Sequence, residues 1–194
     1  MSRAAVAASA PGKVILFGEH AVVYGQPAIA VPVSEVEAKA VVEPAPPGNG
    51  LTLVAADLEQ RWSLTAAPSQ DPLAVAVRLT LRHLSAPVPD ATVTVRSSIP
   101  IASGLGSGAA VSTALVRALG TFMGRTLPPA EVSQLVFEVE KIHHGTPSGI
   151  DNTVIAYEQP VYYVRGAALE AERVAVPTPF TLLVVDTGLP SPTK

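Results

Sequence analysis

The stretch that most limits what this chain can fold into is an alternating segment that leads into a glycine-rich loop and then into a helical pattern. Residues 91–100 (ATVTVRSSIP) alternate apolar and polar side chains, which predicts a strand that ends at the Pro100 breaker. From Gly108 onward, small and apolar residues recur at helical spacing, with Gly124 as a stop signal. The pattern therefore predicts a strand, a loop and a helix in direct succession.

The loop itself, PIASGLGSGAA (100–110), has the chemistry of an anion cradle. Its glycines let backbone N–H groups approach a ligand closely, and the next helix points its unpaired N–H groups and positive dipole end at the same place. The run lacks a lysine and matches neither the Walker A nor the G-x-G-x-x-G spacing. A tight turn from strand to helix would explain the glycines equally well.

The rest of the chain predicts an α+β fold. Strand patterns occur in KVILF (13–17), in the apolar run after Gly25, in EVEAKAVVE (35–43), LTLVA (51–55) and RWSLT (61–65), with PAPPGNG (44–50) as a turn. The 35–43 segment also suits a helix, but alternation favours a strand. Together these segments predict an antiparallel N-terminal sheet.

Two further helices are predicted on either side of the loop and its helix. The first covers 71–85, with Asp71 as N-cap and Pro72 at the first helical position. The second covers PPAEVSQLVFEVEKIHHG and stops at Gly145. Two more strand candidates follow, VYYV (161–164) and FTLLVVDTG (180–188).

Composition excludes several classes of protein. The 194 residues are 48% hydrophobic and 15% charged, as in a globular domain, and a net charge of −3 gives no basic face for nucleic acid. The absence of cysteine excludes disulfides, thiolate catalysis and cysteine-bound metals. Because no run is apolar enough to span a membrane, and the N-terminus is too weakly apolar for a secretory signal, a soluble cytoplasmic protein is expected.

Two groups of polar residues are candidates for chemistry. The first group lies at or just after an apolar strand and consists of Lys13, Glu19 and His20. These residues could be ordinary surface residues, or they could form a rim that faces the substrate. Glu140 and Asp151 are carboxylates of the kind that bind Mg²⁺ or accept a proton, although a solvated helix face and a helix N-cap would also explain them. The adjacent His143 and His144 diverge by about 100° on a helix and cannot share one metal ion.

Three segments in register resemble the GHMP kinase superfamily, and the first of them resembles the mevalonate kinases specifically. These are APGKVILFGEHAVVYG (10–25), PIASGLGSGAA (100–110) and EKIHHGTPSGIDN (140–152). The resemblance covers nearly the whole chain and implies a two-lobed α+β kinase. Its N-terminal lobe, like domain 2 of ribosomal protein S5, would span 1–175, with a mixed, mostly antiparallel sheet and helices on one face. Residues 176–194 would be the first strand of a truncated C-terminal lobe.

The resemblance implies ATP-dependent phosphorylation of the C5 hydroxyl of (R)-mevalonate in isoprenoid biosynthesis, with Mg²⁺ as cofactor. Asp151 would be the catalytic base, Lys13 would polarise the hydroxyl, and Glu19 and His20 would lie near the substrate. Glu140 and Ser107 would bind the metal. The ATP phosphates would be held by the loop residues Pro100, Ile101, Ala102, Ser103, Gly104, Leu105, Gly106, Ser107, Gly108, Ala109 and Ala110.

The chain departs from the family pattern at two places. Gly108 stands where the family loop has a second serine, often a Mg²⁺ ligand, so water or Ser107 would complete the coordination. The chain also ends at Lys194, before the second lobe's glycine-rich motif. A homoserine kinase, a phosphomevalonate kinase or a catalytically silent nucleotide-binding fragment are the alternatives. ATP and mevalonate are the expected partners, with no nucleic acid and no membrane, and with a homodimer as one possible assembly.

Overall fold

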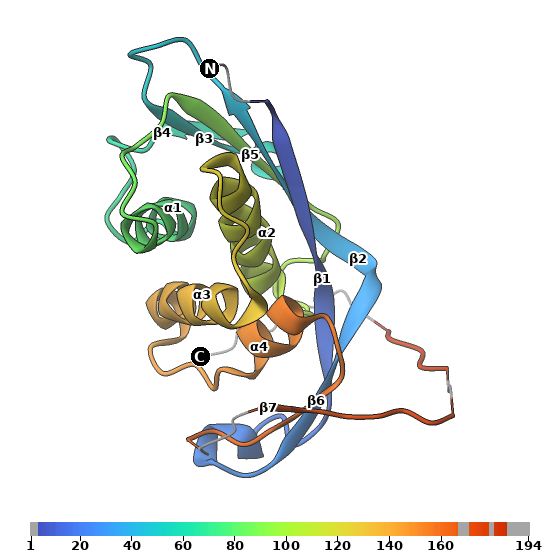
Figure 1. Cartoon of the computed structure of the whole chain (residues 1–194). Coiled ribbons are helices and arrows are strands. Elements are labelled where there is room, and N and C mark those ends of the chain that lie inside the picture. The colour runs from blue at the N-terminus through green and yellow to red at the C-terminus, as the bar shows by residue number, and fades with distance from the viewer. Residues whose placement is uncertain (1–3, 167–170, 179–180, 186–194) are drawn as a thin grey trace.

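A mixed β-sheet carries four α-helices on one of its faces in the computed structural model, which describes residues 4–166, 171–178 and 181–185 (Figure 1). The strands are β1 (Val6–Phe17), β2 (Ala28–Pro44), β3 (Leu51–Ala55), β4 (Gln60–Ser63), β5 (Ala91–Ser97), β6 (Val161–Tyr163) and β7 (Ala171–Arg173). The helices are α1 (Pro72–His83), α2 (Ser107–Phe122), α3 (Pro129–His144) and α4 (Ile150–Tyr157), with short 3₁₀ helices η1 (Ala21–Tyr24) and η2 (Ala56–Leu58). The α+β fold is as predicted.

The long strand β2 organises the sheet. It pairs antiparallel with β1 along most of its length, with β6 near its start and with β5 near its end. Pro32 lies between the β6 and β5 pairings, where a missing N–H on that edge costs no ladder bond. The predicted strand at 35–43 is confirmed. β3 runs parallel to β5, because the intervening β4 and α1 provide the long crossover that a parallel pair needs.

The predicted helices form for the reasons their sequences suggest. The Asp71 carboxylate accepts a hydrogen bond of 2.8 Å from the backbone N–H of Ala74, which caps α1 as predicted. α2 starts at Ser107, one residue before the predicted start, and its small residues let it pack closely against β1 and β2. Most of α2 is buried, so this helix lies in the centre of the core.

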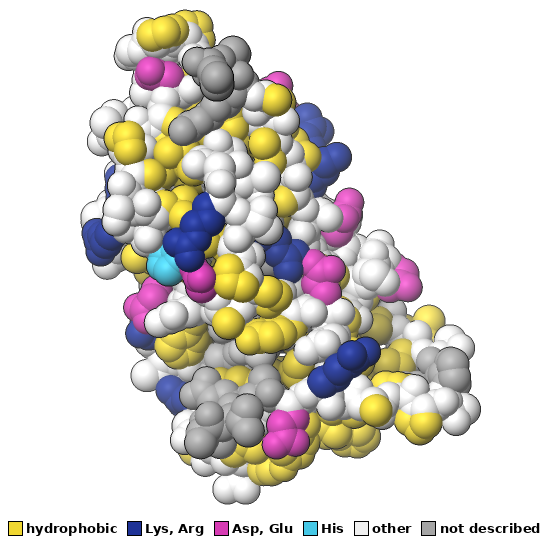
Figure 2. Space-filling model, in the orientation of Figure 1, with side chains coloured by type: hydrophobic (Ala, Val, Ile, Leu, Met, Phe, Trp, Pro, Cys, Tyr) yellow, Lys and Arg dark blue, Asp and Glu magenta, His cyan; other side chains and the backbone are white. Residues whose placement is uncertain are grey.

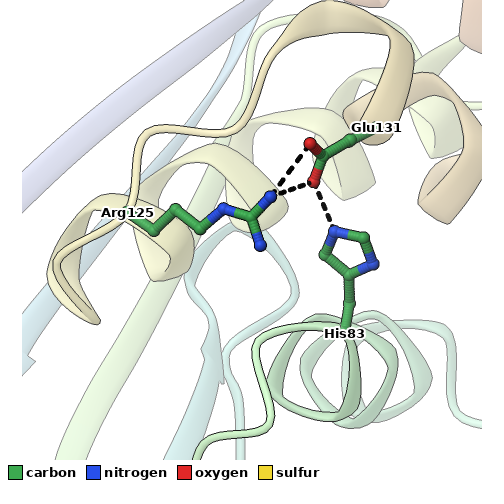
Figure 3. Close-up of polar contacts among 3 residues, drawn as sticks. All are labelled: His83, Arg125 and Glu131. Carbon is green, nitrogen blue, oxygen red and sulfur yellow. Dashed lines mark hydrogen bonds and ion pairs between the residues drawn. The ribbon is translucent and has the colours of Figure 1, made fainter.

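A polar cluster of three residues, His83, Arg125 and Glu131, connects α1 with α3 (Figure 3). One guanidinium nitrogen of Arg125 donates to both carboxylate oxygens of Glu131, at 3.0 and 2.8 Å, and the His83 ring contacts the same carboxylate. The hydrogen bond with His83 is the main cause of the lowered pKa of Glu131, with a further contribution from Arg125. The cluster ties the end of α1 to the first turn of α3.

Charged side chains show no single-sign patch on the face drawn in Figure 2, where basic and acidic groups are scattered among apolar ones. None of the described helices is long and apolar enough to cross a membrane.

Several elements differ from the sequence predictions: β1 begins at Val6, before the predicted strand at 13–17, and the short strand β7 was not predicted. The helix α4 was not predicted, because its eight residues follow a glycine-rich segment and are too few to show a helical period. The strand predicted over 180–188 is absent from residues 181–185, which have no regular secondary structure, so that prediction is wrong there. An isolated apolar run forms a strand only where a neighbour pairs with it. Residues 180 and 186–188 lie outside the described part.

Candidate functional site

Three of the predicted site residues meet beside the start of α2, although they come from three different elements. Lys13 lies on β1, Glu140 on α3 and Asp151 in the first turn of α4. The Lys13 ammonium nitrogen is 3.0 Å from the Asp151 carboxylate, and Lys13 is only 5% exposed. Glu140 is 4% exposed and senses the charges of both. Lys13 and Glu140 are buried and Asp151 is partly buried, which argues against the alternative that these three residues are solvated surface charges.

Lys13 is buried beside an irregularity in the pairing of β1 with β2. Pro11 pairs with Glu37 but Gly12 pairs with Val33, so the extra residues lie on β2, and Gly12 and Lys13 are buried in succession at this point. The backbone N–H of Lys13 donates to the carbonyl oxygen of Leu105 at 3.0 Å. This bond fastens the glycine-rich loop to the strand that carries the lysine.

The glycine-rich loop has the backbone conformation that its sequence demands. Ala102, Gly104 and Gly106 all have positive φ, of 58°, 78° and 74°. Gly106 is also the position where a Cβ would lie 2.9 Å from Cγ of Lys13, so only glycine lets the lysine stem pass. The turn directs the α2 N-terminus toward the lysine, so a tight turn is compatible with an anion cradle at this place.

Pro100 and the Ile101 side chain, which is 73% exposed, lie at the start of the loop, and from Gly104 onward its exposed parts are backbone rather than side chain. Gly104 and Gly108 are exposed, whereas the side chains of Leu105, Ala109 and Ala110 are buried in the core. Gly106 occupies the N-cap of α2 and has no side chain to satisfy the first N–H groups of that helix. The loop can therefore offer a ligand mainly its backbone N–H groups.

Glu140 has the perturbed electrostatics of a functional carboxylate. Burial is the main cause that raises its pKa to about 7, the Asp151 carboxylate raises it further, and Lys13 partly offsets both. A Cβ on Gly108 would lie 3.3 Å from Oε1 of Glu140, so residue 108 faces this carboxylate directly. A cation bound here would stabilise the ionised form.

Asp151 is held in place by its neighbours in the chain and not by capping its own helix. The N-cap of α4 is Gly149, with φ of 92°, so the alternative that Asp151 is an N-cap is wrong. The amide of Asn152 donates to the carbonyl and hydroxyl oxygens of Ser133 on α3, at 3.0 and 2.8 Å. Asn152 is not among the predicted site residues, and its only signal in the sequence is its place directly after Asp151.

Glu19 and His20 lie away from this cluster. Both are exposed in the turn between β1 and η1, and His20 is the N-cap of η1. β1 continues four residues past Lys13 before that turn, about 13 Å at the usual rise of a strand. The structure therefore does not bring them into contact with the lysine and carboxylates.

The donor set around Glu140 suits a hard cation that keeps most of its water. The described residues contain no group of three or more His, Cys, Asp or Glu side chains that could enclose a metal. Glu140, Asp151 and the Ser107 hydroxyl at the start of α2 supply oxygen only. Mg²⁺ typically takes one or two carboxylates and completes its shell with water and phosphate oxygens, which fits this set.

A polar hollow of about 320 Å³ opens beside the entrance to the glycine-rich loop. Its wall is formed by Glu37, Lys39, Asp57, Arg96, Ser97 and Ser98. The Asp57 carboxylate accepts from the Ser97 N–H at 2.6 Å, which anchors the strand end that leads into the loop.

Known proteins match both the sequence and the structure. The family model for the GHMP kinases N terminal domain matches residues 72–159. The mevalonate kinase of Thermococcus sibiricus is 36% identical over 177 residues, which cover 84% of this chain and 52% of that protein. The chain therefore spans about half the length of the curated relatives it matches.

Solved structures of mevalonate kinases are also similar to this chain. The Methanococcus jannaschii mevalonate kinase superposes with a TM-score of 0.75 at 26% identity, covering 90% of this chain and 56% of that one. The L. major mevalonate kinase in complex with R-mevalonate has a TM-score of 0.66 at 30% identity, covering 85% and 50%. Glu140 and Asp151 lie within residues 72–159, which the family model matches, and Lys13 precedes that range.

Proposed function

Because this chain carries the GHMP kinase N-terminal domain and belongs to that family, we propose that it is the N-terminal part of a mevalonate kinase. The enzyme would transfer the terminal phosphoryl group of ATP to the C5 hydroxyl of (R)-mevalonate. The observation that carries the proposal is the contact of Lys13 with Asp151 directly beside Gly106 and the start of α2. The Asp151 carboxylate could accept a proton, the Lys13 ammonium could stabilise negative charge, and the start of α2 could bind phosphate, and all three lie close together.

The nucleotide would bind with its phosphates over the loop at 100–110. The backbone N–H groups at the start of α2, free of any capping side chain, would donate to phosphate oxygens, and the helix dipole would add to the attraction. We assign the nucleoside part to the hollow beside Ser98, since its wall includes the strand end that leads into the loop.

Glu140 and the Ser107 hydroxyl are the residues that would hold Mg²⁺. When bound, the ion would neutralise charge on the phosphate oxygens of ATP. A buried carboxylate whose pKa lies near neutrality is poorly stabilised as an anion without such a cation, which supports this role for Glu140. Gly108 supplies no oxygen, so water would take the position beside it.

Asp151 would act as general base. As the mevalonate hydroxyl oxygen attacks the γ-phosphorus and ADP leaves, the hydroxyl proton would pass to the Asp151 carboxylate. Lys13, fixed by its buried stem and its 3.0 Å contact, would stabilise negative charge on the attacking oxygen. Glu19 and His20, exposed at the far end of β1, would line the outer rim of the substrate site.

The larger organisation follows from the same proposal. Residues 1–175 would form the lobe that binds ATP and substrate, and residues 176–194 would be the first strand of a second lobe; the chain spans about half the length of its relatives. We propose a cytoplasmic location, as expected for an enzyme that acts on two small polar substrates, and a homodimer as the assembly to test.

The test uses this chain and a version extended to the length of its relatives. The 194-residue chain should bind ATP in calorimetry with an affinity that increases with Mg²⁺. The extended protein should release ADP when mevalonate is added, and Asp151→Asn should reduce this release by about 10²–10⁴-fold without loss of folding. Asp90→Asn, which alters a carboxylate that binds the Gly50 N–H outside the site, is the control and should leave the rate unchanged.

Three results would reject the proposal. ADP release that depends on homoserine or phosphomevalonate in place of mevalonate would assign a different substrate. Nucleotide binding with no turnover in the folded, extended protein would indicate a silent binding domain. Unchanged turnover in Asp151→Asn would remove Asp151 from the role of base.

A further inference from the structure

Arg117 makes polar contacts that the site described above does not use. It lies on α2, ten residues after Ser107, with its side chain 22% exposed. One guanidinium nitrogen donates to the Ser9 carbonyl oxygen at 3.0 Å, and the other donates to the Ala156 carbonyl oxygen at 2.8 Å. The guanidinium also forms an ion pair with Glu158.

The two carbonyl groups belong to the two elements that carry the proposed catalytic pair. Ser9 lies on β1, four residues before Lys13, and Ala156 lies on α4, five residues after Asp151. Five residues of helix extend only about 7.5 Å, so a displacement at Ala156 is transmitted to Asp151 with little loss. One rigid guanidinium thus joins the strand of Lys13 to the helix of Asp151.

The end of α4 depends on this contact. The Ala156 carbonyl is among the last four of its helix and has no partner within it. The next turn is tight, because Glu158 has a positive φ of 51°. The first turn of α4 is held to α3 by Asn152, and the last turn is held to α2 and β1 by Arg117. A helix of eight residues fastened at both ends has a fixed position along its axis.

We propose that Arg117 is a positioning residue that sets the contact between Lys13 and Asp151. The inference rests on the proposed function, in which that contact orients the general base. A planar guanidinium can donate to both carbonyl oxygens at once, whereas a lysine ammonium at the same place has a different reach and no fork. Arg117→Lys should therefore fail to replace it.

Arg78 provides a matched control. It is half-buried on α1 and donates to three backbone carbonyl oxygens, those of Leu64, Ala67 and Pro68. Its contacts resemble those of Arg117, but none of them touches β1 or α4. Loss of Arg78 should lower stability without moving the lysine and aspartate.

The experiment measures how fast an amine-reactive acetylating reagent modifies Lys13, by peptide mass spectrometry of the folded 194-residue chain. The exposed Lys141 is the internal reference, since its side chain is 44% exposed against 7% for Lys13. Each variant is labelled at a temperature that lies the same number of degrees below the midpoint of its own thermal unfolding. Arg117→Ala should raise the relative rate at Lys13 about tenfold, as expected for loss of a hydrogen-bonded charged contact, and Arg117→Lys should raise it nearly as much. Arg78→Ala should leave it unchanged.

The result is independent of kinase activity, because the labelling needs neither ATP nor mevalonate. If Arg117→Ala does not fold, Glu158→Gln loosens the same guanidinium from its exposed side and should give a smaller rise at Lys13. An unchanged rate in the folded variants, an equal rise in Arg78→Ala, or full restoration by Arg117→Lys would overturn the proposal. A rise at Lys13 in a protein that binds no nucleotide would instead reject the proposed function and leave the positioning role intact.

Discussion

Replacing Glu140 with glutamine tests the electrostatics of the site most directly. Glutamine has nearly the same shape but never ionises. The buried Glu140 carboxyl has its pKa raised from 4.5 to about 7, mainly by burial and secondly by the Asp151 carboxylate. The wild-type protein must therefore keep a proton on Glu140 in the folded state at a pH where the unfolded chain has already released it.

The sign and size of the effect follow from this difference. Below pH 4.5 Glu140 is protonated in both the folded and the unfolded state, so its ionisation does not change the free energy of unfolding. Between 4.5 and about 7 the folded state binds more protons than the unfolded state, and the free energy of unfolding falls as the pH rises. Above 7 both states are ionised, and the full cost of about 3 kcal/mol is present. Between pH 5 and pH 8 the stability of Glu140→Gln relative to wild type should increase by about 2–3 kcal/mol.

The assay is urea unfolding of wild type and variant at pH 5, 6, 7 and 8, in the absence of nucleotide and divalent cations. Other groups that titrate in this range are common to both proteins and cancel in the difference. The control is Glu138→Gln on the same helix, whose carboxylate is 46% exposed and paired with Lys141. Its difference from wild type should stay within about 0.5 kcal/mol throughout. A flat difference for Glu140→Gln would refute the reasoning.

Three further changes test the loop and its surroundings. Gly106→Ala should destabilise the fold by about 1–2 kcal/mol and weaken MgATP binding, because φ is positive at this position and the added Cβ would contact the Lys13 stem. Urea unfolding measures the stability and calorimetry measures the binding, and wild-type values for both would contradict the close packing. Gly108→Ser places a hydroxyl beside Glu140 and should increase the gain in ATP affinity that Mg²⁺ provides, so an unchanged or smaller gain in calorimetry would show that residue 108 does not face the metal. Asp71→Ala removes the cap of α1 and should cost about 1 kcal/mol in unfolding with no change in nucleotide binding, and a loss of binding would mean that α1 contributes to the site.

Short-range patterns account for the parts of the fold that were predicted correctly. The Asp71 cap, the alternation in 91–100 and the glycines of the loop each act through neighbours a few residues away, so they can be identified from the chain alone. The eight residues of α4 were missed because too few turns are present to show a period. The strand predicted over 180–188 failed in its described part because apolar character alone supplies no pairing neighbour.

The sequence was enough to establish which residue types the site contains and the order in which the chain supplies them. Lys13, the loop at 100–110, Glu140 and Asp151 could each be identified as candidates, and each also had an ordinary structural explanation. Only the tertiary structure shows that these residues lie together, because the 3.0 Å contact of Lys13 with Asp151 joins segments more than 100 residues apart, and the burial that chiefly raises the pKa of Glu140 comes from packing. Charges interact through space and not along the chain, so their effect on one another exists only once the strand and the two helices have packed around the start of α2.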